Sequence, residues 1–208
     1  MPDPTLSIVI PAFNEETRLA PTVRGAVELV RGRGVAGEVI VVDDGSRDGT
    51  SALVQRLAGD LPEVRLVRLA ANHGKGYAVR SGVLNATGEL VLFADADGAT
   101  PWGELARLEA AVARGADVAI GSRALHSADT RVQARWYRRA MGRTFHRLVE
   151  LLTVRGFRDT QCGFKLFRGA VAQDLFARMR MDGFIFDVEL LLMAQRGGHR
   201  VAEVPVNW

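Results

Sequence analysis

Two aspartates separated by a single residue follow an apolar run near the middle of the chain. Asp95 and Asp97, with Ala96 between them, come directly after the apolar residues 90–94. Two carboxylates placed so close repel each other, and a divalent cation such as Mg²⁺ or Mn²⁺ would offset the repulsion and bind phosphate oxygens as well. Solvated loop aspartates, or a helix cap before Pro101, would give the same pattern. The spacing alone leaves a metal site and a plain turn equally open.

A second acidic pair, Asp43 and Asp44, follows the apolar run 39–42. A carboxylate at the end of a strand can accept hydrogen bonds from ribose hydroxyls or from a base N–H. We predict that Asp43 and Asp44 contact ligand. The neighbouring Ser46 and Asp48 are predicted to be structural, because Ser and Asp favour turns and helix caps.

The glycine-rich turn 72–76 reads NHGKG and opens a helical pattern. Glycine lets a backbone approach a ligand closely, and a helix N-terminus favours anions, so Lys75 and Gly76 are candidate ligand-binding residues. The pattern is not a P-loop, and no GxGxxG follows the first apolar run. These absences argue against a P-loop nucleotide hydrolase and against a dinucleotide-dependent oxidoreductase.

The basic residues are almost all arginines, and they gather in one segment. Residues 131–149 contain six arginines and no acidic residue. The spacing of apolar residues predicts an amphipathic helix over 132–153, which would either bind anionic lipid or pack as an ordinary surface helix. Arg138 and Arg139 on this helix, with Arg123 after the apolar run 118–120, could hold a phosphate through their guanidinium groups.

The composition is that of a globular protein of 208 residues, with 48% apolar and 25% charged residues and a net charge of +3. We find no run long enough to span a membrane and no signal-peptide pattern. The single cysteine, Cys162, excludes an internal disulfide framework and suits a reducing cytoplasm. The four scattered histidines give no zinc site or serine triad.

Short apolar runs alternate with helical patterns, which predicts an α/β fold with a largely parallel sheet and helices on both faces. Ligands of such sheets bind beyond the carboxyl ends of the strands, where the polar clusters fall. Two further helices and a final strand are expected after the motif at 159–168. The expected strands are 6–10, 39–42, 64–69, 90–94 and 118–120, and the expected helices of this half are 17–31, 51–57, 75–86 and 102–114.

Five segments, taken in order and spacing, carry a resemblance to a known family. They read SIVIPAFNEE, VIVVDDGSRDGT, NHGKGYAVRSGVLNATGELVLFADADG, GSR and DTQCGFKLFR. The chain resembles the inverting family 2 glycosyltransferases with a GT-A fold, and within them the polyprenyl-phosphate hexosyltransferases, over residues 5–208. The resemblance implies a single domain, 1–208, with a nucleotide-sugar-binding half at about 1–122 and an acceptor-binding half at about 123–208.

The resemblance also implies roles for individual residues. Asp95 and Asp97 would hold the metal, with Asp97 the more direct ligand and the one we count as catalytic. Three arginines would bind the acceptor phosphate, and Arg123 among them is also counted as catalytic. The residues placed around the nucleotide sugar are Pro11, Phe13, Glu15, Asp43, Asp44, Lys75, Gly76, Asp95, Ala96 and Asp97. The residues placed on the acceptor side are Arg123, Arg138, Arg139, Asp159, Gln161, Lys165 and Asp187.

The implied reaction is metal-dependent, inverting transfer of a hexose from a nucleotide sugar to a polyprenyl or dolichyl phosphate. Mannosyl relatives read DADLQHPP, with a Gln that helps to hold the metal, and tend toward DCTSGFR. This chain reads DADGATP, with Ala99 at the place of that Gln, and DTQCGFK, which favours UDP-glucose over GDP-mannose. A GDP-mannose donor is the alternative.

An acceptor phosphate is already anionic at pH 7, so its attack needs no general base. A soluble or glycan hydroxyl acceptor would need one, for which Asp159 is the first candidate and Asp187 the second. A catalytically silent nucleotide-sugar-binding subunit is a third hypothesis. The lipid acceptor implies a peripheral protein at the cytoplasmic face of the membrane, docked through 132–153 or through a separate membrane partner, and no nucleic acid partner.

Overall fold

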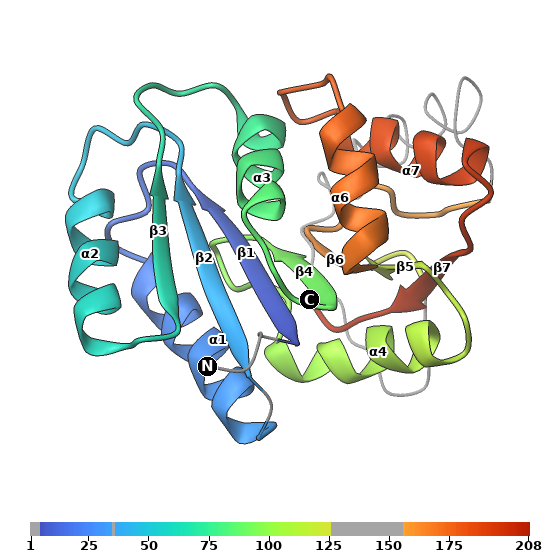
Figure 1. Cartoon of the computed structure of the whole chain (residues 1–208), viewed down its shortest axis with the longest axis horizontal. Coiled ribbons are helices and arrows are strands. Elements are labelled where there is room, and N and C mark those ends of the chain that lie inside the picture. The colour runs from blue at the N-terminus through green and yellow to red at the C-terminus, as the bar shows by residue number, and fades with distance from the viewer. Residues whose placement is uncertain (1–4, 35, 126–155) are drawn as a thin grey trace.

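The computed structural model describes residues 5–34, 36–125 and 156–208 (Figure 1). The predicted amphipathic helix at 132–153, with Arg138 and Arg139, lies outside the described residues. The elements in the first half are β1 Leu6–Ala12, α1 Leu19–Gly32, β2 Gly37–Asp43, α2 Thr50–Asp60, β3 Val64–Arg68, α3 Lys75–Leu84, β4 Leu90–Ala94, the 3-10 turn η1 Trp102–Glu104, α4 Leu105–Ala113 and β5 Val118–Ser122. After the undescribed stretch come β6 Phe164–Arg168, α6 Gly169–Arg178, α7 Phe186–Arg196 and β7 Val201–Pro205.

Within the described residues these strands form one seven-stranded sheet in the order β3-β2-β1-β4-β6-β5-β7. All neighbours in it are parallel except at β6, which runs antiparallel to both β4 and β5. The predicted α/β class and largely parallel sheet are therefore confirmed. No strand was expected at 164–168, because the charged Lys165 interrupts the apolar pattern of a strand whose first four residues are buried.

Residues of the central strands alternate between two apolar cores, as the period of a strand requires. Ile8 and Val41 pack with residues of α1, α2 and α4, whereas Val9 and Ile40 pack with residues of α3, α6 and α7. Figure 1 shows these helices covering the two faces. Because both faces are covered, the strands read as continuous apolar runs in the sequence.

One edge of the sheet collects the polar loops. The carboxyl ends of β1, β2, β4 and β5 meet there because these strands run in the same direction. The antiparallel β6 begins at the same edge, so the loop 159–163 arrives beside the loop that follows β4. The segment after β7, which ends at Trp208, also lies there, because β7 is parallel to β5.

None of the described helices is both long enough and apolar enough to cross a membrane. The division of the chain into a donor half and an acceptor half stays a prediction.

Candidate active site

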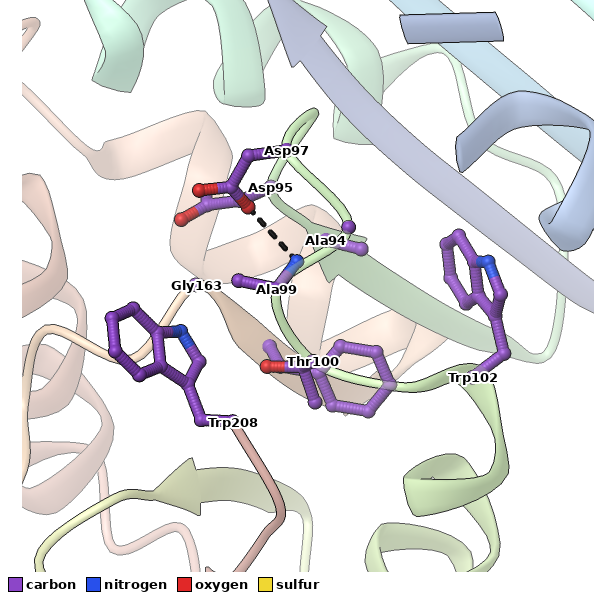
Figure 2. A pocket seen from close by; sticks show the side chains of 10 residues that line it. Ala94, Asp95, Asp97, Ala99, Thr100, Trp102, Gly163 and Trp208 are labelled. Carbon is purple, nitrogen blue, oxygen red and sulfur yellow. Dashed lines mark hydrogen bonds between the residues drawn. The ribbon is translucent and has the colours of Figure 1, made fainter. Parts of the chain in front are cut away.

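The loop after β4 presents the two predicted metal ligands at the edge of the sheet. Asp95 and Asp97 line one pocket, and Figure 2 shows their carboxylates turned toward the same side. The Asp97 side chain is exposed, and its Oδ1 accepts a hydrogen bond of 3.1 Å from the Ala99 N–H. Gly98 has a φ of 62°, which L residues rarely adopt, and makes the turn possible. The side chain of Ala96 is buried, and its carbonyl accepts a hydrogen bond from the Thr22 hydroxyl.

The glycine-rich turn brings a cation to this pair. Lys75 is the first residue of α3, and its Nζ lies 2.7 Å from Oδ1 of Asp95. The same ammonium lies 5.3 Å from the centre of the Phe93 ring. Gly74, with a φ of 103°, allows the sharp entry to the helix, and Gly76 is buried against the carbonyl of Met181. Two clusters that are 19 residues apart in the sequence thus form one ion-paired site.

The acidic pair at the end of β2 is turned into the protein. Asp43 accepts hydrogen bonds from the Ser46 N–H and the Ser51 hydroxyl, and Asp44 accepts hydrogen bonds from the N–H groups of His73 and Gly74. Both side chains belong to buried residues, with 1% and 3% exposure respectively. These carboxylates hold the loops at the edge of the sheet, and their contact with a nucleotide stays a prediction.

The structural roles predicted for Ser46 and Asp48 agree with their contacts. The Ser46 hydroxyl accepts a hydrogen bond from the Asn14 N–H, and Asp48 accepts hydrogen bonds from the N–H and the hydroxyl of Thr50, the first residue of α2.

The end of β1 and the loop after it carry three of the residues predicted to surround the base and the ribose. Pro11 is buried within β1, whereas Phe13 is 42% exposed and its ring is available to a planar ligand. Glu15 forms an ion pair with Arg18, and its N–H donates to the Thr50 hydroxyl. A hollow beside this loop is lined by residues that include Arg18, Thr22 and Asp97.

The loop after β5 and the loop before β6 are joined by an ion pair. Nε and Nη2 of Arg123 donate to the two carboxylate oxygens of Asp159 at 2.7 and 2.9 Å, and the backbone N–H of Arg123 donates to the same group. Burial opposes both charges, but the mutual hydrogen bonds and attraction outweigh it, so the pKa of Asp159 is lowered and that of Arg123 is raised. Asp159 is a weak base in this arrangement.

A second ion pair lies deeper. Nζ of Lys165, on β6, lies 2.6 Å from Oδ1 of Asp187, in the first turn of α7, and the two side chains are 1% and 3% exposed. Burial raises the pKa of Asp187, and the charge of Lys165 opposes that rise. Lys165 and Asp187 were predicted to line the acceptor side, and both side chains are almost fully buried. Gln161, also predicted on the acceptor side, is half-buried, and its Nε2 has no hydrogen-bond partner among the described residues.

Two residues that the sequence did not single out help to form the site. Trp208 lines the pocket with Asp95 and Asp97 (Figure 2), and its ring lies 5.4 Å from the guanidinium carbon of Arg123. Gly163 faces Asp95 so closely that a Cβ there would lie 2.0 Å from Oδ2. A glycine inside a polar motif was the available signal for Gly163. No local signal could have brought Trp208 to residues more than a hundred positions away.

The carboxylates present suit a hard divalent cation. Asp95 and Asp97 supply oxygen donors on one side of the pocket, and the exposed Asp97 leaves room for further ligands. The described residues contain no group of three or more His, Cys, Asp or Glu side chains placed to hold a metal. Mg²⁺ is usually bound by one or two protein carboxylates, and substrate phosphates and water complete its coordination shell.

Comparison with known proteins gives a consistent family. The model of glycosyl transferase family 2 matches residues 7–176. Dolichyl-phosphate beta-glucosyltransferase from Homo sapiens is 39% identical over an alignment that covers 100% of this chain and 68% of the relative. The protein of the same name from Saccharomyces cerevisiae is 35% identical, with 98% and 66% covered. The chain thus spans about two thirds of the length of these relatives.

Solved structures show the same fold at lower identity. A Pyrobaculum calidifontis mannosyltransferase in complex with GDP-Man and Mn²⁺ superposes with a TM-score of 0.66 at 21% identity, covering 99% of this chain and 56% of that one. Glucosyl-3-phosphoglycerate synthase from Mycobacterium tuberculosis, with Mn²⁺, UDP-glucose and glycerol 3-phosphate, gives 0.69 at 19%, covering 98% and 70%. The predicted GT-A fold is confirmed by these likenesses.

Proposed function

The chain belongs to glycosyl transferase family 2 and is a glycosyltransferase, and we propose that it transfers glucose from UDP-glucose to a dolichyl or other polyprenyl phosphate. Relatives named dolichyl-phosphate beta-glucosyltransferase align with the whole chain, which supports the sugar and the acceptor. The paired carboxylates of Asp95 and Asp97, at the sheet edge where α/β folds bind ligands, carry the proposal for the donor side.

We propose that Asp95 and Asp97 hold Mg²⁺ or Mn²⁺, which would stabilise the negative charge that grows on the departing diphosphate. Lys75 lies 2.7 Å from Asp95 and is placed to attract the same phosphates. Phe13, which follows β1 and is 42% exposed, would stack on the base. Most of the rate enhancement would then come from positioning and from fixed charges rather than from proton transfer.

The described carboxylates favour a phosphate acceptor over a hydroxyl acceptor. A hydroxyl must lose its proton to a base during attack, whereas a phosphate is already anionic. Asp159 is held by Arg123 in a bidentate ion pair that lowers its pKa, and Asp187 is enclosed with Lys165. Neither is placed to take a proton from an incoming hydroxyl. Arg123 would instead contribute positive charge for the acceptor phosphate.

A polyprenyl-phosphate acceptor resides in a membrane, so we propose that the protein works at the cytoplasmic face, either docked on the lipid or delivered by a membrane partner. The basic segment 131–149 is the proposed lipid contact, since six arginines without an acidic residue would be attracted to anionic headgroups.

The test is a radiolabel transfer assay with the purified full chain, Mn²⁺ or Mg²⁺, and dolichyl phosphate in detergent. UDP-glucose and GDP-mannose are supplied in parallel, and we expect label in the lipid phase from UDP-glucose only. Asp97→Ala should reduce the transfer by at least about a hundredfold, in the range measured when a charge-stabilising group is removed. Asp60→Ala, at the exposed end of α2, is the matched control and should transfer normally.

Three outcomes would contradict parts of this proposal. Lipid labelling from GDP-mannose alone would show that GDP-mannose, and not UDP-glucose, is the donor. Donor hydrolysis without lipid labelling would move the acceptor to a soluble hydroxyl compound. Full activity in a folded Asp97→Ala variant would contradict the proposal that the loop after β4 holds the metal ion.

A further inference from the structure

The buried ion pair of Lys165 and Asp187 makes no contact with substrate in the function proposed above, because neither side chain lines the pocket. The Lys165 ammonium lies 5.8 Å from the centre of the Phe93 ring of β4. Asp187 stands in α7 between Phe186 and Val188, which belong to the same apolar core as Phe93. Removing two charges from water costs several kcal/mol per ion in general. Proteins in which apolar residues of similar size replace such a pair are often as stable as the original or more stable. Stability alone is therefore a poor explanation of the pair.

The ammonium of Lys165 also holds the loop that enters β6. Its Nζ donates a hydrogen bond of 2.5 Å to the carbonyl of Cys162, while Asp187 holds the other side of the same ammonium at 2.6 Å. Lys165 itself is fixed in the sheet, between Phe93 of β4 and Ile120 of β5. The pair therefore ties the peptide after Cys162 to the sheet and to the start of α7.

That peptide leads directly to the metal-site loop. The carbonyl of Gly163 accepts a hydrogen bond of 3.0 Å from the N–H of Asp95. The Cα of Gly163 faces the Asp95 carboxylate, since a Cβ built on it would lie 2.0 Å from Oδ2 and 2.4 Å from Oδ1. The Asp95 carboxylate thus contacts both the Gly163 backbone and the Lys75 ammonium.

We propose that Lys165 and Asp187 are a positioning pair: they hold the Cys162–Gly163 peptide in the place that orients the Asp95 carboxylate for a divalent cation. The inference rests on the proposed function for the identity of that cation site. Neither residue touches the reacting atoms. Their effect passes through one carbonyl, one peptide and one backbone hydrogen bond to Asp95.

The test replaces the pair with apolar residues of similar volume, Lys165→Met together with Asp187→Leu. A single replacement of Lys165 would leave a buried carboxylate without its partner, so the double variant is the one expected to fold. Mn²⁺ binding is measured by electron paramagnetic resonance without any substrate, and transfer is measured as a function of Mn²⁺ concentration. Exchange of the Asp95 amide hydrogen reports the bond to Gly163.

We expect the double variant to keep its melting temperature within a few degrees and to bind Mn²⁺ about 10- to 100-fold more weakly, the range typical for residues that orient metal ligands. The transfer rate should recover at saturating Mn²⁺, so the apparent KM for the metal changes more than kcat. Exchange of the Asp95 amide should accelerate. The matched control is Glu38→Gln with Arg65→Met, an ion pair at the opposite edge of the sheet, which should leave Mn²⁺ affinity unchanged.

The inference is overturned if the double variant folds, binds Mn²⁺ as tightly as the wild type does and keeps the slow exchange of the Asp95 amide hydrogen. This conclusion does not depend on which sugar the wild type transfers. A wild type that transfers no glucose, while Asp95 exchange still accelerates in the variant, supports the positioning role and overturns only the proposed function. If the double variant does not fold, Asp187→Asn takes its place, because it keeps the volume and an oxygen for Lys165. The same measurements then decide.

Discussion

The ion pair between Arg123 and Asp159 joins the loop after β5 to the loop before β6, and a double-mutant cycle would measure its strength. The variants are Arg123→Met, Asp159→Asn and both together. The two side chains are 31% and 9% exposed, so removing the arginine leaves a largely buried carboxylate without its charge partner. Breaking a buried ion pair in this way costs about 3–5 kcal/mol of folding free energy. Because Arg123 is partly exposed, we expect a cost of about 3 kcal/mol for Arg123→Met.

For a chain of this size a loss of that order lowers the melting temperature by roughly 6–12 °C. Urea unfolding of the four proteins at pH 7 gives the free energies of unfolding, and we expect the double variant to be more stable than the sum of the single losses predicts. A coupling free energy of about 2 kcal/mol is expected for groups that share two hydrogen bonds.

The coupling should also depend on pH. Arg123 lowers the pKa of the Asp159 carboxyl in the folded protein, against the opposing effect of burial. A carboxyl with a lowered folded pKa stabilises the protein above its unfolded pKa of about 3.9, and this stabilisation is lost as the pH falls through the folded value. The coupling should therefore be constant from pH 7 to about pH 5 and decline below about pH 4. Asp159→Asn should show no such decline at this site.

Losses that add within about 0.5 kcal/mol would refute the argument, since additivity means that the two groups do not interact. A coupling that persists unchanged at pH 2 would refute the assigned ionisation.

Two further predictions concern single residues of the same loop. Gly163→Ala should destabilise the fold by about 1–3 kcal/mol and weaken Mn²⁺ binding, because its Cβ would lie 2.0 Å from the Asp95 carboxylate. The control is Gly103→Ala, because a Cβ at Gly103 would have no atom within 4 Å. Equal Mn²⁺ affinities of the two variants would count against the steric argument. Burial raises the pKa of the Cys162 thiol to about 12. Alkylation of this thiol by iodoacetamide at pH 7.5 should therefore be about a thousandfold slower in the native protein than in the unfolded protein. Equal alkylation rates would contradict the burial of Cys162.

Much of the fold could be predicted from the sequence. Each expected strand of the first half overlaps a strand of the sheet. The central strands are covered on both faces and leave nearly continuous apolar runs, whereas the edge strand β3 reads VRLVR. Strand β6 could not be found in this way, since the buried Lys165 interrupts its pattern. Its charge is compensated by Asp187, 22 positions further along the chain, and local periodicity carries no information about such a partner.

The candidate site divides in the same way. That Asp95, Asp97 and Lys75 belong to one edge of the sheet follows from their places after strands in a parallel arrangement. What each carboxylate does there does not follow. The contact of Asp43 and Asp44 with a ligand stays a prediction, and the structure adds that their oxygens accept hydrogen bonds from the protein's own loops.

The sequence by itself therefore determined the class of fold, the edge of the sheet that carries the candidate site and the family resemblance, because these depend on residue types at short spacing. Only the tertiary structure decided which charges are paired, that Trp208 lines the pocket, and that Gly163 packs against Asp95. Those contacts join segments far apart in the chain, and their free energy depends on distance, burial and direction, which arise only when the sheet has brought the loops together.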